Sequence, residues 1–284
     1  MGNLECIVCK NRQFSPLYKG VVKCEECGHS TADMELSDEE LFTIYKKNYF
    51  FGEEYSDYLG DRKLFQRNFR LRFKTLQRFL QAERHKSLLE IGCAYGFFLE
   101  IAQPYFEIAK GIDITEDGVK YAHDVLKLDC IQADFLTHPI NEQSFDVVCM
   151  WDTIEHLRNP HLYIEKFAKN MPKGGLLAIT TGDLDSFNSR FRREKWRLIH
   201  PPTHLHYFSR KTLQKMLSNY GYEVTYNQYC GNYRSIQHAA HNLLVLGYNK
   251  PDLYSSIMKI GLTNLPLYFN LFDITYTIAR KVAN

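Results

Sequence analysis

Four cysteines near the start of the chain are spaced for metal ligation. They form two Cys-x-x-Cys pairs, which are separated by 14 residues: Cys6, Cys9, Cys24 and Cys27. Four thiolates in this pattern are typical of a closed tetrahedral Zn²⁺ site, which is structural because no position is left for an activated water. A segment of about 30 residues cannot bury a sufficient core, so we expect the ion to supply its folding free energy. Residues 1–33 are therefore predicted to form a zinc ribbon, and reduced structural cysteines are the alternative.

Three histidines lie within seven residues in a stretch that also contains prolines: His200, His204 and His206. An imidazole has a pKa near neutrality, which suits it to take a proton from a reacting group. We predict that this stretch faces a substrate and that His204 is the general base, with His206 and His200 as alternatives. A scaffold role, in which the rings only hold a turn through hydrogen bonds, is the competing interpretation.

The segment Leu-Leu-Glu-Ile-Gly-Cys-Ala-Tyr-Gly, residues 88–96, is an apolar run that reaches an acid and then carries small residues at alternate positions. The acid is Glu90, and the small residues are Gly92, Ala94 and Gly96. This pattern predicts a strand that turns into a helix, with a loop against which a ligand can lie. A dinucleotide-binding loop would have its third glycine where Phe97 stands, and that ring would block a phosphate. An ordinary strand–helix turn is the alternative to a ligand site.

Two carboxylates follow at the ends of the next predicted strands. Asp113 lies 21 positions after Gly92, where the second strand of a βαβ unit should end, and a carboxylate there can accept both ribose hydroxyls. Asp134 lies near the end of a third strand. A fourth apolar strand then leads into Trp-Asp-x-x-Glu-His-Leu, residues 151–157.

In this order, the motifs of residues 45–284 resemble those of class I S-adenosylmethionine (SAM) dependent methyltransferases of the small-molecule or sugar type. The resemblance implies SAM as cofactor and an α/β Rossmann-like fold, with a seven-stranded sheet whose last strand is antiparallel. It also implies that Asp134 contacts the adenine amino group and that Phe135 lies against the ring. The cofactor-binding residues expected in total are Glu90, Gly92, Ala94, Gly96, Asp113, Asp134, Phe135 and Trp151.

A candidate second metal site follows the fourth strand. Asp152, Glu155 and His156 resemble the Glu-x-x-Glu-His motif of some metal-assisted O-methyltransferases, and His204 would be the remote ligand. A cation there would polarise the acceptor hydroxyl as a Lewis acid. Metal-free members of the class carry the same letters, so a site without a cation is the alternative.

The elements that must position these residues follow from hydrophobic periodicity. Apolar runs predict five strands, which end near residues 91, 113, 134, 150 and 181. Residues 221–225 are predicted as the sixth strand and residues 273–281 as the antiparallel seventh. Ser209 is expected to cap the helix that follows it.

Residues 34–86 are predicted as connector or lid helices between the ribbon and a methyltransferase domain of residues 87–284. An aromatic run, residues 45–58, resembles a lid that folds over the cofactor, and simple packing on the core is the alternative. Residues 62–86 predict an amphipathic helix with a basic outer face. That face is either solvated or in contact with an anionic substrate, nucleic acid or a membrane surface. Its cations are Arg62, Lys63, Arg67, Arg70, Arg72, Lys74, Arg78, Arg84 and Lys86.

Two insertions in the domain, residues 183–208 and 231–270, are predicted to shape the substrate side. The first contains a basic cluster suited to a phosphate-bearing acceptor: Arg190, Arg192, Arg193, Lys195 and Arg197. The second is rich in Leu, Tyr and Asn, and it would wall a substrate pocket, pair protomers or touch a membrane-bound acceptor. The sequence does not choose among these roles and leaves the oligomeric state open.

Composition agrees with one sizeable core and a small appendage, because the chain has 284 residues of which 45% are apolar. The net charge of +2 argues against a strongly polyanionic partner. No apolar signal region or membrane-spanning run is evident, and the eight cysteines favour a reducing compartment, so we expect a cytoplasmic protein.

The sequence thus predicts a SAM-dependent methyltransferase with a structural Zn²⁺ ion. The expected reaction is O-methylation of a small-molecule acceptor: a sugar, a nucleotide-linked glycan or a related metabolite, with anionic or phosphate-bearing acceptors included. An RNA methyltransferase that uses the ribbon for recognition is the first alternative, because ribbons also precede SAM domains in rRNA-modifying enzymes. A protein-docking factor with a vestigial SAM fold is the second.

Overall fold

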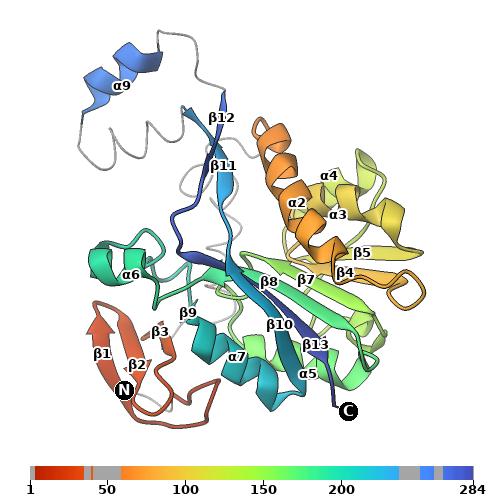
Figure 1. The fold of residues 1–284 in the computed structure, drawn as a ribbon, viewed down its shortest axis with the longest axis horizontal. Coiled ribbons are helices and arrows are strands. Elements are labelled where there is room, and N and C mark those ends of the chain that lie inside the picture. Colours follow the sequence, from red (N-terminus) through yellow and green to blue (C-terminus); the bar gives the residue numbers. More distant parts are fainter. Residues whose placement is uncertain (1–3, 35–39, 41–58, 237–249, 259–264, 284) are drawn as a thin grey trace.

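The computed structural model describes residues 4–34, 40, 59–236, 250–258 and 265–283. Its centre is a seven-stranded sheet with the order β10-β13-β8-β7-β4-β5-β6 (Figure 1). Strands β4 to β8 pair in parallel, whereas β13 is antiparallel to both β8 and β10. The strand bounds are β4 Ser87–Ile91, β5 Ile108–Asp113, β6 Asp129–Gln132, β7 Val147–Trp151, β8 Leu176–Gly182, β10 Tyr222–Tyr229 and β13 Ile274–Lys281. This confirms the predicted α/β sheet.

Successive residues of each strand point to opposite faces of the sheet, so the strands feed two apolar layers. Leu88 and Val147 pack in the layer that also holds side chains of α2, α3 and α4. Leu89 and Val148 pack in the layer with α5 and α7. The helices are α2 Arg62–Gln77, α3 Phe97–Ala102, α4 Glu116–Asp124, α5 Pro160–Asn170 and α7 Arg210–Asn219, with short turns η1 Gln103–Tyr105, η2 Pro139–Glu142 and η3 Arg193–Lys195.

The N-terminal segment forms its own small sheet, which lies beside α7 (Figure 1). Strands β1 Phe14–Tyr18, β2 Val21–Cys24 and β3 Ser30–Ala32 are antiparallel neighbours. A fourth strand, β9 His206–Tyr207, comes from the first predicted insertion and pairs with β3. Cys6 and Val8 belong to the same apolar layer as α7, and Asn219 at the end of α7 donates to the Val8 carbonyl at 2.8 Å. The ribbon segment is therefore joined to the central domain by a strand and by a shared core.

The remaining described elements lie in the two insertions. Helix α6 Phe187–Arg192 follows β8, and β11 Asn232–Ser235 pairs with β12 Pro266–Phe269, with α9 Pro251–Met258 beyond them (Figure 1). Helix α7 begins with a capping box between Ser209 and Thr212, which confirms the predicted Ser209 cap. In the part of the chain that the structure describes, no helix has the length and apolar character to cross a membrane.

One prediction for the connector is wrong. Arg72 was placed on the basic outer face of α2, but its side chain is only 8% exposed because it pairs with Asp152. The buried residues of this helix otherwise follow the predicted apolar face, with Phe73 added to Phe69 and Leu76. The predicted lid, residues 45–58, lies outside the described residues, as do residues 35–39 and 41–44 of the connector.

Candidate active site

The loop after β4 has the backbone conformation that its small residues indicate. Gly92 and Gly96 have φ angles of +74° and +73°, which side chains strongly disfavour. A Cβ at Gly92 would lie 2.6 Å from Thr153 Oγ1, so this loop touches the loop after β7. A Cβ at Gly96 would lie 2.6 Å from a Leu128 methyl group and 3.0 Å from Ala122 Cβ. Close packing against α4 and Leu128 therefore explains why position 96 is a glycine. At position 92, a glycine allows the loop after β4 to contact the loop after β7.

Asp113, at the end of β5, ties the glycine-containing loop to the second strand. Its Oδ2 accepts the Ala94 N–H at 2.8 Å, and its Oδ1 accepts the Thr115 N–H at 2.8 Å and the Thr115 hydroxyl at 2.6 Å. A carboxylate offers about four acceptor positions, so one more donor can be received. Burial raises the pKa of Asp113. The hydrogen bonds lower it, and the effect of burial is the larger one.

Glu90 lies inside the sheet and is only 2% exposed. Burial raises the pKa of its carboxyl well above the usual range. Its Oε2 is buried and has no hydrogen-bond partner among the described residues. Buried polar atoms are nearly always satisfied, so a ligand with a donor group fits at this position.

The predicted adenine-binding residues lie at the end of β6. Asp134 Oδ1 accepts the Leu136 N–H at 2.7 Å and the Tyr163 hydroxyl at 3.3 Å. Phe135 is a core residue, because its ring packs 5.4 Å from that of Tyr163 and 4.8 Å from that of Phe167. Its contact with adenine stays a prediction. Trp151, at the end of β7, is also buried.

Arg72 is a site residue that the sequence interpretation missed. Its Nη2 lies 2.7 Å from Asp152 Oδ2, and Asp152 Oδ1 accepts the Thr180 hydroxyl at 2.9 Å. Burial opposes ionisation of Asp152, but the charge of Arg72 and these bonds outweigh it and lower the pKa of the carboxyl. The signal was available, because Arg72 lies three residues after Phe69 and four before Leu76, on the apolar face of α2.

His204 is 6% exposed and has a defined tautomer. Its Nδ1–H donates to the Leu198 carbonyl at 2.9 Å, so Nε2 carries the lone pair. Burial lowers the pKa of His204 well below its usual range, which keeps the ring neutral at physiological pH but makes it a weaker base than the near-neutral imidazole that the sequence predicts. The ring centroids of His200 and His156 lie 4.0 Å and 4.6 Å away.

The structure brings together three of the four residues of the candidate second metal site. Potential ligand atoms of Glu155, His156 and His204 lie within 4.8 Å of one another. His156 Nδ1–H donates to the Thr203 carbonyl at 2.8 Å, which leaves the lone pair on Nε2 as in His204. Asp152 is outside this group, since its carboxylate is bonded to Arg72 and Thr180.

His206 differs from His204 because both of its ring nitrogens are bonded within the protein. Nε2–H donates to the Arg158 carbonyl at 3.0 Å, and Nδ1 lies 3.3 Å from His29 Nε2. His29 belongs to the ribbon segment and is 1% exposed. His206 therefore links the ribbon to the loop after β7.

The basic cluster of the first insertion is divided between two environments. Arg190, Arg192, Arg193 and Lys195 are exposed. Arg197 is turned inward and donates to Asp273 Oδ1 at 2.9 Å. Its Nε and Nη1 are buried and have no hydrogen-bond partner in the described part of the chain. Burial lowers the pKa of Arg197, and the carboxylates of Asp273 and Asp152 oppose that shift.

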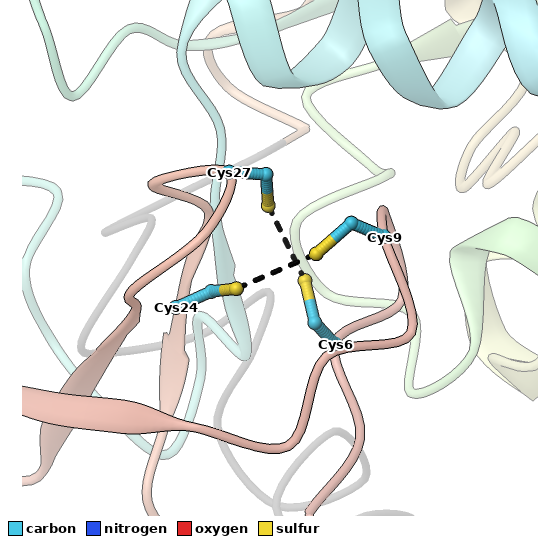
Figure 2. A group of neighbouring side chains, drawn as sticks. All are labelled: Cys6, Cys9, Cys24 and Cys27. Atoms are coloured by element: carbon cyan, nitrogen blue, oxygen red, sulfur yellow. Dashed lines mark hydrogen bonds between the residues drawn. The ribbon is translucent and has the colours of Figure 1, made fainter.

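The four N-terminal cysteines converge on one point (Figure 2). Cys6 Sγ lies 3.5 Å from Cys27 Sγ, and Cys9 Sγ lies 3.5 Å from Cys24 Sγ. A tetrahedron with Zn–S bonds of about 2.3 Å has S–S edges of roughly 3.8 Å, so the sulfur atoms fit a zinc ion. Burial raises the pKa of the Cys27 thiol to about 11, and a bound cation would favour the thiolate instead.

The sheet order, the antiparallel β13 and the loops after β4, β5 and β6 define a class I SAM-dependent methyltransferase. The family model described as "Methyltransferase domain" matches residues 62–227, more than half of the chain. The chain belongs to this family, and it is a SAM-dependent methyltransferase.

Known proteins are similar to this chain over segments of different length. A ubiquinone biosynthesis O-methyltransferase of Glaesserella parasuis is 31% identical over 106 residues, which cover 34% of this chain and 45% of that protein. The match thus spans less than half the length of this relative. An uncharacterized protein of Methanocaldococcus jannaschii is 26% identical over 174 residues, 61% of this chain and 79% of that one. A solved SAM-dependent methyltransferase of Thermotoga maritima has a TM-score of 0.53 at 17% identity, over 85% of this chain and 99% of that chain, which shows the fold.

Proposed function

We propose that this enzyme methylates an oxygen of a small anionic acceptor: a charged sugar, a nucleotide-linked glycan or a related metabolite. The observation that carries the proposal is a partly paired guanidinium, Arg197, in the segment that holds His204: Arg197 donates to Asp273, and His204 Nδ1–H donates to the carbonyl of the adjacent Leu198. Its Nε and Nη1 are buried donors without an acceptor in the described residues. A guanidinium with two such N–H groups suits a phosphate or carboxylate. The similarity to an O-methyltransferase over 106 residues supports oxygen as the methylated atom.

The cofactor residues would hold SAM at the ends of β4, β5 and β6. Glu90 would receive its ammonium group, Asp113 one of its ribose hydroxyls and Asp134 its adenine amino group. When bound, SAM supplies an already activated methyl carbon. The remaining work of the protein is to orient the acceptor, exclude water and take one proton.

We assign proton removal to His204. Its Nδ1–H is fixed on the Leu198 carbonyl, so the lone pair of Nε2 is available to the acceptor hydroxyl. His206 is less suited, because both of its nitrogens are bonded to His29 and Arg158. The proton would leave the acceptor oxygen as that oxygen attacks the methyl carbon, and Nε2 would then hold it.

A divalent cation at Glu155, His156 and His204 is the alternative to a free histidine base. The observation in its favour is that the three ligand atoms lie within 4.8 Å of one another. Chelation separates the two mechanisms. Methyl transfer that survives EDTA and fails in His204→Ala identifies the histidine as base, whereas loss in EDTA with recovery on adding Mn²⁺ identifies the cation.

We also propose that Cys6, Cys9, Cys24 and Cys27 hold one structural Zn²⁺ ion. All four tetrahedral positions would be filled by the protein, so the ion has no catalytic role of its own. Metal analysis of protein purified without added zinc should find about one equivalent. Retention of full zinc content after replacing two of these cysteines by serine would reject the site.

A transfer screen with labelled SAM tests the function. Nucleotide sugars, glycolipids and RNA are offered to the full chain, and label is expected in an anionic sugar-bearing acceptor. Arg197→Gln should then raise the KM for that acceptor while leaving SAM affinity unchanged, and Arg193→Gln should change neither. Label found only in RNA, with salt-dependent binding, would replace the proposal by an RNA methyltransferase. Equal KM values in the two arginine variants would reject the role of Arg197.

A further inference from the structure

Helix α6 turns its apolar side toward solvent. Phe187 and Phe191 are 81% and 77% exposed, whereas Ser186 and Ser189 are 1% and 0% exposed. The two phenylalanine rings lie one turn apart and stack at 6.2 Å with an interplanar angle of 13°. A helix that buries serines and exposes a pair of aromatic rings has the reverse of the usual pattern. Such a pattern marks an interaction surface.

The orientation of α6 is fixed by polar contacts on its inner side. Ser186 caps the helix by accepting the Ser189 N–H at 3.1 Å. Asn188 donates to Asp273 Oδ2 at 2.7 Å, and the Trp196 indole N–H donates to the same carboxylate at 2.9 Å. Because Asp273 is 1% exposed, these contacts hold α6 with its rings outward.

A second exposed apolar segment lies next to this helix. Leu271 and Phe272 are 49% and 60% exposed, and they directly precede Asp273, to which α6 is bonded. Exposed cations flank the rings along the sequence of α6 and η3. Residues 185–195 carry Arg190, Arg192, Arg193 and Lys195 against the two acids Asp185 and Glu194.

We propose that α6, together with Leu271 and Phe272, docks on the surface of an anionic lipid membrane. Aromatic and leucine side chains enter the boundary between headgroups and acyl chains, and arginines beside them bind lipid phosphate. The excess of cations over acids around the rings favours an anionic bilayer over a neutral apolar partner. The surface follows β8 and precedes β13, so docking would turn the ends of the strands that bear the acceptor site toward the membrane (Figure 1).

The test measures vesicle binding by the full chain and needs no acceptor, so it is independent of the proposed function. Vesicles of phosphatidylcholine with about one third phosphatidylglycerol are compared with pure phosphatidylcholine vesicles in a flotation assay. Wild type should bind the anionic vesicles, less in high salt, and bind the neutral vesicles weakly. The variant Phe187→Ser/Phe191→Ser should bind the anionic vesicles at least about tenfold more weakly.

The matched control is Ile108→Ser/Val125→Ser, which removes two apolar side chains that are 51% and 57% exposed on β5 and after α4. It should bind vesicles as wild type does, and all variants should keep the SAM affinity of wild type. The proposal is overturned if wild type does not bind anionic vesicles, or if the phenylalanine variant and the control variant bind these vesicles equally. Self-association that is lost in Phe187→Ser/Phe191→Ser, without vesicle binding by wild type, would assign the surface to a second copy of the chain.

Discussion

The proposed cofactor site and the proposed acceptor site of this enzyme differ in how far apart in the sequence their contacting residues lie. On the cofactor side, Asp113 bonds to residues 19 and 2 positions away. On the acceptor side, Arg72 reaches Asp152 across 80 positions, and His29 reaches His206 across 177. The proposed cofactor site is thus held mainly by contacts within and between neighbouring strand–loop–helix units. The proposed acceptor site combines residues of the connector helix, the first insertion and the ribbon segment.

This difference has a functional consequence. A ligand common to the whole class can be bound by short-range motifs, whereas acceptor binding can vary with the attached segments. Substitutions on the acceptor side should therefore change methyl transfer or stability and spare SAM affinity. Substitutions on the cofactor side should change SAM affinity directly.

The largest effect is expected for His204→Ala. If Nε2 takes the acceptor proton, turnover should fall by about 10²–10⁴-fold with SAM affinity intact. The residual rate should rise with pH, because the acceptor then ionises without help. Steady-state transfer of labelled methyl groups measures this, with the exposed His123→Ala as control. Near-normal turnover in His204→Ala would exclude it as the base.

Arg72→Met should destabilise the fold while Arg70→Met, on the exposed side of the same helix, should not. Removing one partner of a buried pair costs about 3–5 kcal/mol. We expect about 2–3 kcal/mol here, because the Asp152 side chain is 38% exposed. Urea unfolding at neutral pH measures the difference between the variants.

The same pair should show a defined pH dependence. Arg72 lowers the pKa of Asp152, so its contribution is complete above the ordinary aspartate pKa of about 3.9 and is lost as pH falls through the folded value. The stability gap between wild type and Arg72→Met should therefore narrow in acid. If the difference in unfolding free energy between wild type and Arg72→Met stays constant down to pH values where Asp152 is protonated, the ion pair is not the cause of that difference.

Asp113→Ala should weaken SAM binding by roughly 1.5–3 kcal/mol, the scale of a hydrogen bond to a charged group. Part of this loss would come from the Ala94 and Thr115 contacts that position the loop. Calorimetry with SAM measures it, and the exposed Asp117→Ala is the control. Unchanged affinity in Asp113→Ala would remove this residue from the cofactor site.

The sequence predicted the sheet and the cofactor loops because strand periodicity and small-residue spacing are local signals. It could not place β9, since a two-residue strand has no pattern of its own and exists only through pairing with β3. It places Arg72 wrongly because the run of cations along residues 62–86 obscures that this one arginine falls on the apolar face of α2. The spacing of the motif groups Asp152 with Glu155 and His156. In the structure Asp152 pairs with Arg72 and lies outside that group of potential ligands.

We propose that methyl transfer to the acceptor depends on the folded ribbon segment, and replacing two of its proposed zinc ligands tests this most directly. β3 pairs with β9 immediately beside His204, and His29 is bonded to His206. In Cys6→Ser/Cys9→Ser, SAM affinity should stay within about threefold of wild type, because the cofactor contacts are made elsewhere in the chain. Transfer to the acceptor should fall by about 10²-fold, the effect of a small displacement of catalytic groups. Full transfer by this zinc-free variant, or loss of SAM binding in parallel with transfer, would contradict the account.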